Sequence, residues 1–196
     1  VLFSLIFTCL SGCLIPILIK GKFRIAYNRK SKNSLAGWIF IVITVLLGVF
    51  GSGAFNKFIE LNYSFFVFLK YVLLFFNMSL AISLFAFLII PEVLSSISEK
   101  SKGLITVLTI GLFFFIGFEV DTLLKDTELA FTMGLLGFLF GMAYYFLKNF
   151  WIVFFALYGT ILINTLSENK YDDFPFWILI VSCAISITIL LSLIHI

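Results

Sequence analysis

The sequence predicts an all-α protein, a polytopic bundle of about seven transmembrane helices (six to seven) with little soluble mass. Hydrophobic residues make up 62% of the 196 positions and charged residues 12%, whereas soluble domains contain roughly 45–50% apolar and about 25% charged residues. The apolar residues also occur in long uninterrupted runs, and a helix needs about 20 such residues to cross a bilayer. Composition and run length together exclude an ordinary soluble domain.

Dividing the apolar runs at charged residues and turn formers predicts the individual spans. They fall at 1–19, 36–55, 71–90, 104–120, 129–147, 150–166 and 175–194. The third span begins earlier, near Tyr63, if Lys70 lies within the membrane. The stretch 58–68 is otherwise expected to lie along the membrane surface, with Lys70 extending to the headgroups. We expect all spans to belong to one transmembrane domain covering residues 1–196.

Residues at the ends of these spans are typical of helices that cross a membrane. Trp38, Trp151 and Trp177 each fall within the first residues of a span, where an indole prefers the headgroup region. Pro175 follows two aspartates, which places proline in the first turn of the last helix and acids at its positive end. Pro91 closes the third span.

Both ends of the chain lie inside apolar runs. Residue 1 is Val, and residues 191–196 read LSLIHI, which resembles a translated sequencing adapter. We therefore expect a fragment of a longer chain with a non-native tail at 191–196, and we assign no chemistry to His195.

The distribution of charge predicts the orientation. The loop at 20–35 carries six basic residues and no acid, and the odd-numbered loops together carry a net charge of +7 against −4 for the even-numbered loops. Because Lys and Arg accumulate on the cytoplasmic side, the odd loops are expected inside, in what we expect to be a bacterial cytoplasmic (inner) membrane.

Small residues mark two helix faces that favour close packing. In the fifth span they recur at spacings of four, three and four; the set is Ala130, Gly134, Gly137 and Gly141. The second span has a comparable patch at Gly48 and Gly51. Packing within the chain is the simplest interpretation of both faces, and homo-oligomer formation, a partner membrane subunit or a flexible gate are the alternatives.

Four polar residues are candidates for an ion or substrate pathway, because polar groups at membrane depth are costly and often functional. Glu119 and Asp121 end the fourth span, where solvation at a helix end is the alternative interpretation. Lys70 and Asn77 lie seven residues apart and share a helix face if the third span begins early. Asn77 and Asn164 also suit interhelical hydrogen bonds.

Several functions are disfavoured by missing motifs. The sequence has no HExxH, GxSxG, CxxC, Walker or dinucleotide-binding pattern, so we predict no cofactor, no metal centre and no catalytic residues in this stretch. The single basic cluster lies between two apolar runs, which argues against nucleic-acid binding. The lipid bilayer is the one partner that the composition itself implies.

Three functional classes remain after these exclusions. A permease or transporter-like protein for a small solute or ion is favoured, because nearly all of the chain is apolar helix with short loops. A membrane-embedded enzyme acting on lipid or polyprenyl-linked substrates is the first alternative. The membrane anchor or sensor part of a signalling protein is the second.

Overall fold

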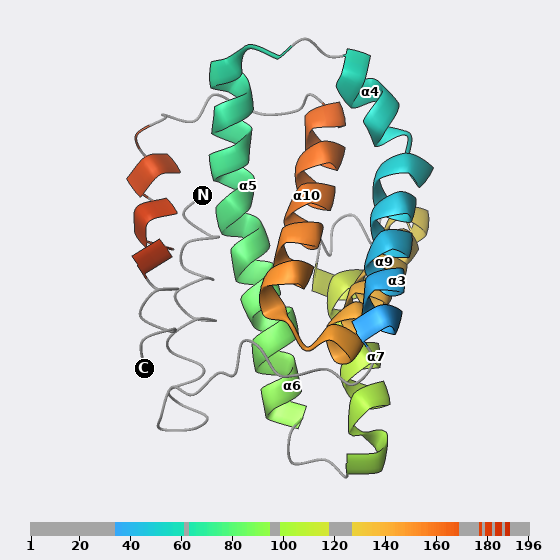
Figure 1. Ribbon diagram of the computed structural model, residues 1–196. Helices are drawn as coiled ribbons and strands as arrows, with labels where there is room; N and C mark the ends of the chain where they lie inside the picture. Colours follow the sequence, from blue (N-terminus) through green and yellow to red (C-terminus); the bar gives the residue numbers. More distant parts are fainter. Residues whose placement is uncertain are drawn as a thin grey trace. The chain divides into compact units, whose positions relative to one another are not determined.

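The computed structural model describes residues 34–60, 63–94, 99–117 and 127–168, together with residues 177, 179–181, 183–185 and 187–188. Its regular elements in these ranges are all helices, which confirms the all-α class (Figure 1). A helix satisfies its own backbone hydrogen bonds, which an apolar segment in lipid must do because no water is present there. The predicted spans 1–19 and much of 175–194 lie outside the described residues, so the count of seven stays a prediction.

The helices follow one another with short connections. The elements with defined bounds are α3 (Ser34–Val45), the π-helix η2 (Leu46–Gly51), α4 (Ala54–Glu60), α5 (Phe65–Leu84), the π-helix η3 (Phe85–Ile89), α6 (Ile90–Val93), α7 (Glu99–Gly117), α9 (Thr127–Leu147) and α10 (Phe150–Glu168). α3 continues into η2, and α5 continues through η3 into α6.

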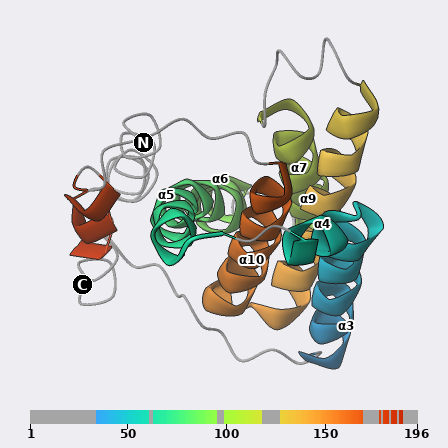
Figure 2. The same ribbon diagram turned by 90° about the horizontal axis from the view of Figure 1, so that it is seen from above.

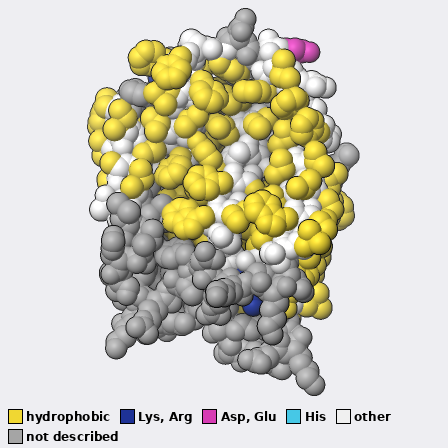
Figure 3. All heavy atoms as spheres, in the orientation of Figure 1, with side chains coloured by type: hydrophobic (Ala, Val, Ile, Leu, Met, Phe, Trp, Pro, Cys, Tyr) yellow, Lys and Arg dark blue, Asp and Glu magenta, His cyan; other side chains and the backbone are white. Residues whose placement is uncertain are grey.

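Four of the described helical stretches are long and apolar enough to cross a membrane. They are Ser34–Gly51, Phe65–Ile89, Ala130–Leu147 and Phe150–Ser167, and Gly103–Ile116 is a shorter apolar helix. On the face drawn in Figure 3, hydrophobic side chains cover most of the described surface. In water such a surface would be unfavourable, whereas lipid solvates it well. The described helices are thus compatible with an integral membrane protein.

The third span begins at the earlier of the two starts that the sequence allows. Ser64 has an extended backbone, and its side chain accepts a hydrogen bond from the Val67 amide, at 3.4 Å, which makes it the N-cap of α5. Residues 65–68 therefore belong to α5 and not to a separate surface segment. α4 is a short helix that turns off the end of η2 (Figures 1 and 2).

The chain divides into two compact units, which we describe separately. The described residues of the first unit run from 45 to 85 and from 154 onward. Those of the second run from 34 to 44 and from 86 to 153.

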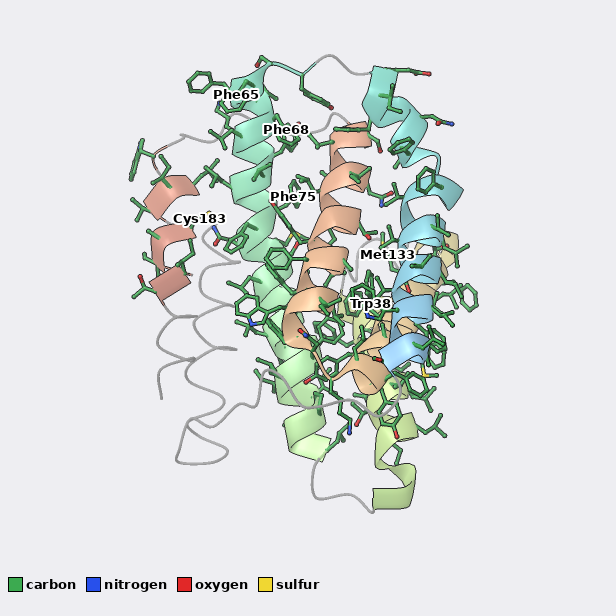
Figure 4. All side chains as sticks on the ribbon, in the orientation of Figure 1. Trp38, Phe65, Phe68, Phe75, Met133 and Cys183 are labelled. Atoms are coloured by element: carbon green, nitrogen blue, oxygen red, sulfur yellow. The ribbon has the colours of Figure 1, made fainter. Side chains whose placement is uncertain are left out.

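In the first unit, α5 packs against α10. Tyr158 donates a hydrogen bond to the Val72 carbonyl, at 2.8 Å, and Phe76 meets the ring of Phe154 edge to face at 5.7 Å. Residue numbers rise along α5 as they fall along α10, so the two helices are antiparallel. Figure 4 shows Phe68 and Phe75 between them, and both belong to the apolar cluster around Leu166.

In the second unit, α7 and α9 form an antiparallel pair that lies side by side in Figures 1 and 2. The small-residue face of α9 lies against α7: a Cβ on Gly137 would stand 2.5 Å from Phe114 Cγ, and one on Gly134 3.0 Å from Phe115 Cβ. On α7, Gly111 lies opposite the Gly134 carbonyl in the same way. Side chains at these glycines would hold the two backbones apart.

The α9–α10 connection is the two-residue turn at Lys148 and Asn149. Lys148 has a positive φ of 49°, and its amide donates to the Tyr144 carbonyl at 2.7 Å, which closes the end of α9. Asn149 then caps α10 by accepting from the Ile152 amide at 3.3 Å. One strained residue and one cap are enough to reverse the chain.

Candidate functional site

The four residues predicted for a pathway are not brought together by the described structure. Glu119 and Asp121 lie outside the described residues. Lys70 lies in the second turn of α5 and is half-buried, while Asn77 lies two turns further along and is 1% exposed. Other polar side chains are buried within the helices or join one helix to another.

Asn77 links α5 to the last predicted span. Its Nδ2 donates to the Cys183 Sγ at 3.5 Å, and the Cys183 thiol donates to the Leu73 carbonyl at 3.2 Å. Figure 4 shows Cys183 beside α5. A thiol is a weak hydrogen-bonding group, so these contacts join the two segments only weakly.

Two hydroxyl groups are buried deeper in α5. Ser79 and Ser83 are each 0% exposed, and in the described part of the chain neither hydroxyl oxygen has a hydrogen-bond partner. Leaving a buried hydroxyl unpaired costs about 1–3 kcal/mol. The two serines are four residues apart and continue the helix stripe on which Val72 and Phe76 meet α10.

The helix widens directly after this serine pair. η3 is a π-helix over Phe85–Ile89, and Pro91 follows it by two residues. Proline has no N–H to donate, and its ring clashes with the carbonyl four residues earlier, here that of Phe87. A wider turn relieves this clash, and π-turns inside α-helices occur frequently at functional sites.

A second polar group closes the end of η2, in the first unit. Asn164 of α10 donates through Nδ2 to the Gly48 carbonyl at 2.6 Å and to its own helix at the Thr160 carbonyl at 2.9 Å. The Ser52 hydroxyl lies 2.9 Å from Asn164 Oδ1. The prediction that Asn164 forms interhelical hydrogen bonds is confirmed.

The helix end at this point has a specific cause in the sequence. Gly53 has a φ of +69°, a conformation that glycine adopts without strain, and its amide donates to the Phe50 carbonyl at 3.1 Å. The last carbonyls of a helix have no hydrogen-bond donor within the helix. The Ser52 hydroxyl and Asn164 Nδ2 are the side-chain donors to the Gly48 carbonyl. Gly51 was expected to lie on a closely packed helix face. No described atom lies within 4 Å of a Cβ built on it, so the described residues show no close packing there.

Tyr63 fastens the loop before α5 to the last turn of α10. Its hydroxyl donates to the Leu166 carbonyl. Burial raises the pKa of Tyr63 above its ordinary value, and the neighbouring Tyr71 raises it further. The neutral phenol, which is the form that can donate, is therefore favoured in the folded protein.

The sequence marks Ser52 as part of a loosened or terminating helix end, but it does not identify Tyr63 or the serine pair of α5 as parts of a site. Ser52 carried a signal, since it lies between two glycines at the end of an apolar run. In the sequence the serine pair, Ser79 and Ser83, suits hydrogen bonds between helices better than ligands to a substrate. Its unpaired hydroxyls depend on what packs around α5, which no local pattern encodes.

Apart from the half-buried Lys70 of α5, the buried and half-buried polar groups of the described residues are neutral. Of the charged side chains described there, Lys57, Glu60 and Lys148 are exposed. No group of three or more His, Cys, Asp or Glu that could hold a metal ion occurs among the residues that the structure describes. Hydroxyl, amide and carbonyl oxygens can bind a small solute or an ion.

Comparison of the chain with protein families, with curated proteins and with solved structures finds no match. The functional interpretation therefore depends on the residues themselves.

Proposed function

We propose that the protein is a multi-pass membrane permease that moves a small solute or ion across the bilayer. The observation that carries this proposal is the buried serine pair of α5, Ser79 and Ser83, immediately before the π-helix η3. A buried hydroxyl without a partner is unfavourable unless water or a ligand occupies it. A solute path supplies such an occupant.

The interruptions of the helices support the same proposal. The second span ends as a π-helix, breaks at Ser52–Gly53 and restarts as α4. Transporters commonly place substrate and ion sites at discontinuous helices, because the interrupted backbone offers free polar groups. Non-helical backbone at membrane depth is tolerated where it lines a cavity or is buried in protein.

The orientation of the helices across the membrane is also part of the proposal. Seven spans with the basic 20–35 loop inside would place the second and sixth loops together on the outer side. The contacts of Ser52 with Asn164 and of Tyr63 with Leu166 agree with this, because they join the ends of the second and sixth spans. An inner bacterial membrane is the location that we propose from the charge pattern.

Flux into proteoliposomes tests the proposal. The full chain is reconstituted and screened against a panel of small ions, sugars, amino acids and organic acids. We expect at least one solute to accumulate with saturable kinetics, and the double variant Ser79→Ala/Ser83→Ala to lose most of this flux. Thr109→Val is the matched control, because the Thr109 hydroxyl bonds to its own helix at the Ile105 carbonyl, 2.8 Å away.

Two outcomes would contradict the proposal. One is the absence of saturable flux for every solute of the panel with correctly inserted protein. The other is unchanged flux in the double serine variant, which would show that the buried hydroxyls do not line the path.

A further inference from the structure

Four oxygen atoms crowd together at the break in the second span. The Ser52 hydroxyl oxygen lies 2.9 Å from the Gly48 carbonyl, 3.2 Å from the Val49 carbonyl and 2.9 Å from Asn164 Oδ1. A serine hydroxyl has one proton to donate. It can donate to one of these three acceptors at a time, and its oxygen also accepts from the Ala54 amide at 3.3 Å, so the carbonyl and amide oxygens of the cluster still have more lone pairs than protons.

The orientation of the Asn164 amide does not remove this excess. Its Nδ2 already serves two carbonyls, those of Gly48 and Thr160. Turning the amide over would place Oδ1 against both carbonyl oxygens, 2.6 and 2.9 Å away, where no proton is available. The hydrogen-bond network thus fixes Oδ1 toward Ser52.

The electrostatic setting favours a positive ion. η2 ends at Gly51, and α10 ends at Glu168, four residues after Asn164. The C-terminal end of a helix carries a partial negative charge of roughly half an elementary charge. Two such ends meet at the cluster and favour a cation, whereas the N-terminal end of the short helix α4, whose Ala54 amide donates to the Ser52 hydroxyl oxygen at 3.3 Å, opposes it in part.

The ligand atoms select the class of cation. All four are neutral oxygens from backbone carbonyls, a hydroxyl and an amide, whereas sites for Ca²⁺ and Mg²⁺ generally include carboxylates. Neutral carbonyl oxygens at unwound helix ends bind Na⁺, and rings of carbonyls replace the water shell of K⁺. A single positive charge is therefore the best match.

An ion can reach the cluster from one side. Ser52 is exposed, and no described atom lies within 4 Å of a Cβ built on Gly51 or on Gly53.

We infer that the Val49 carbonyl, the Ser52 hydroxyl and Asn164 Oδ1, together with the Gly48 carbonyl, form a binding site for a monovalent cation, Na⁺ or K⁺. Asn164 Nδ2 stays on its two carbonyls and holds the amide oxygen toward the ion. A role of this ion in driving transport rests on the proposed function, whereas its binding does not.

Ion-dependent thermal stability of the purified full chain in lipid nanodiscs tests the inference. Unfolding is followed in NaCl, KCl and choline chloride at equal ionic strength, because a ligand that binds only the folded state raises its stability with concentration. We expect a saturable rise of the Tm in Na⁺ or in K⁺ over choline, and the comparison of the two salts identifies the ion.

Substitutions locate the site. Ser52→Ala should weaken the apparent affinity for the ion about tenfold, which corresponds to about 1.4 kcal/mol for one lost ligand, and Ser52→Thr should restore it because threonine keeps the hydroxyl. Thr165→Val is the matched control, since the Thr165 hydroxyl bonds to its own helix at the Ile161 carbonyl; its affinity should stay within about twofold of the parent.

Two results would overturn the inference. Equal Tm values of the parent protein in all three salts would show that no such ion binds, whether or not the variants fold. An ion effect that is undiminished in Ser52→Ala would place the ion elsewhere. Because flux is not measured, failure of this experiment leaves the transport proposal standing, and absent flux leaves the site standing.

Discussion

Replacing Asn164 with leucine removes the amide that joins α10 to the end of the second span. Leucine keeps the branched shape of the side chain, although it is larger, while two interhelical contacts disappear: Nδ2 with the Gly48 carbonyl at 2.6 Å and Oδ1 with the Ser52 hydroxyl at 2.9 Å. Interhelical hydrogen bonds in membranes contribute about 0.6 kcal/mol on average and up to about 1.7 kcal/mol. The Gly48 carbonyl, at a helix end, also loses the nearer of its two side-chain donors.

Because Asn164→Leu removes two such bonds, we expect it to lower the free energy of unfolding by about 1.5–3 kcal/mol. Reversible unfolding in mixed micelles measures this value, with choline as the only added cation so that ion binding does not contribute. Combining Asn164→Leu with Ser52→Ala should give less than the sum of the two single effects, by about 0.5–1 kcal/mol, because the two side chains share one hydrogen bond.

Thr165→Val provides the reference, because the Thr165 hydroxyl lies one residue away on α10 and contacts only its own helix in the described bonds. A loss in Asn164→Leu within about 0.5 kcal/mol of this control would refute the reasoning. Strict additivity of the Ser52 and Asn164 effects would contradict the shared bond specifically.

Three further predictions concern the packing of α9 on α7, the turn at Lys148 and the titration of Tyr63. Gly137→Ala should destabilise the protein by about 1–3 kcal/mol, because the new methyl meets Phe114. Gly159→Ala should not, since no described atom lies within 4 Å of a Cβ built there, and equal unfolding curves of the two variants would contradict this. Lys148→Gly should stabilise by up to about 1 kcal/mol by relieving the positive φ, while Lys148→Val should destabilise, as thermal unfolding can show. Because the pKa of Tyr63 is raised in the folded state, its stabilising contribution is complete below pH 10, the ordinary pKa, and is lost as the pH rises through the folded value. The parent protein should thus lose stability on alkaline titration relative to Tyr63→Phe, and parallel pH curves would contradict this.

The sequence was sufficient where lipid alone decides the structure. Runs of apolar residues long enough to cross a bilayer must form helices, and the predicted spans 36–55, 129–147 and 150–166 overlap closely with Ser34–Gly51, Ala130–Leu147 and Phe150–Ser167. The two-residue turn at Lys148–Asn149 could also be predicted, since both flanking runs end there. Small residues at 134, 137 and 141 were recognisable as a packing face because their spacing follows the helix period.

Contacts between distant segments could not be derived in this way. α5 starts after the cap at Ser64. In the sequence Lys70 is a competing signal for the start of this span, so the sequence alone did not decide between the two. The widening at η3 follows from Pro91, but its place beside buried serines depends on packing around α5. The oxygen cluster joins Ser52 and Asn164 across 112 positions, and nothing local to either residue specifies the other.

We propose that the chain crosses the membrane repeatedly, with the basic loop on the cytoplasmic side and the acidic loops outside. Single cysteines at Ser31 and at Asn169, in a background whose three native cysteines are replaced by alanine, measure this directly in intact cells with a membrane-impermeant thiol reagent. We predict that the cysteine at position 169 reacts and that the one at position 31 reacts only after the cells are permeabilised. Reaction of position 31 with protection of position 169 would contradict the orientation, and the same behaviour at both positions would contradict the alternation of the spans.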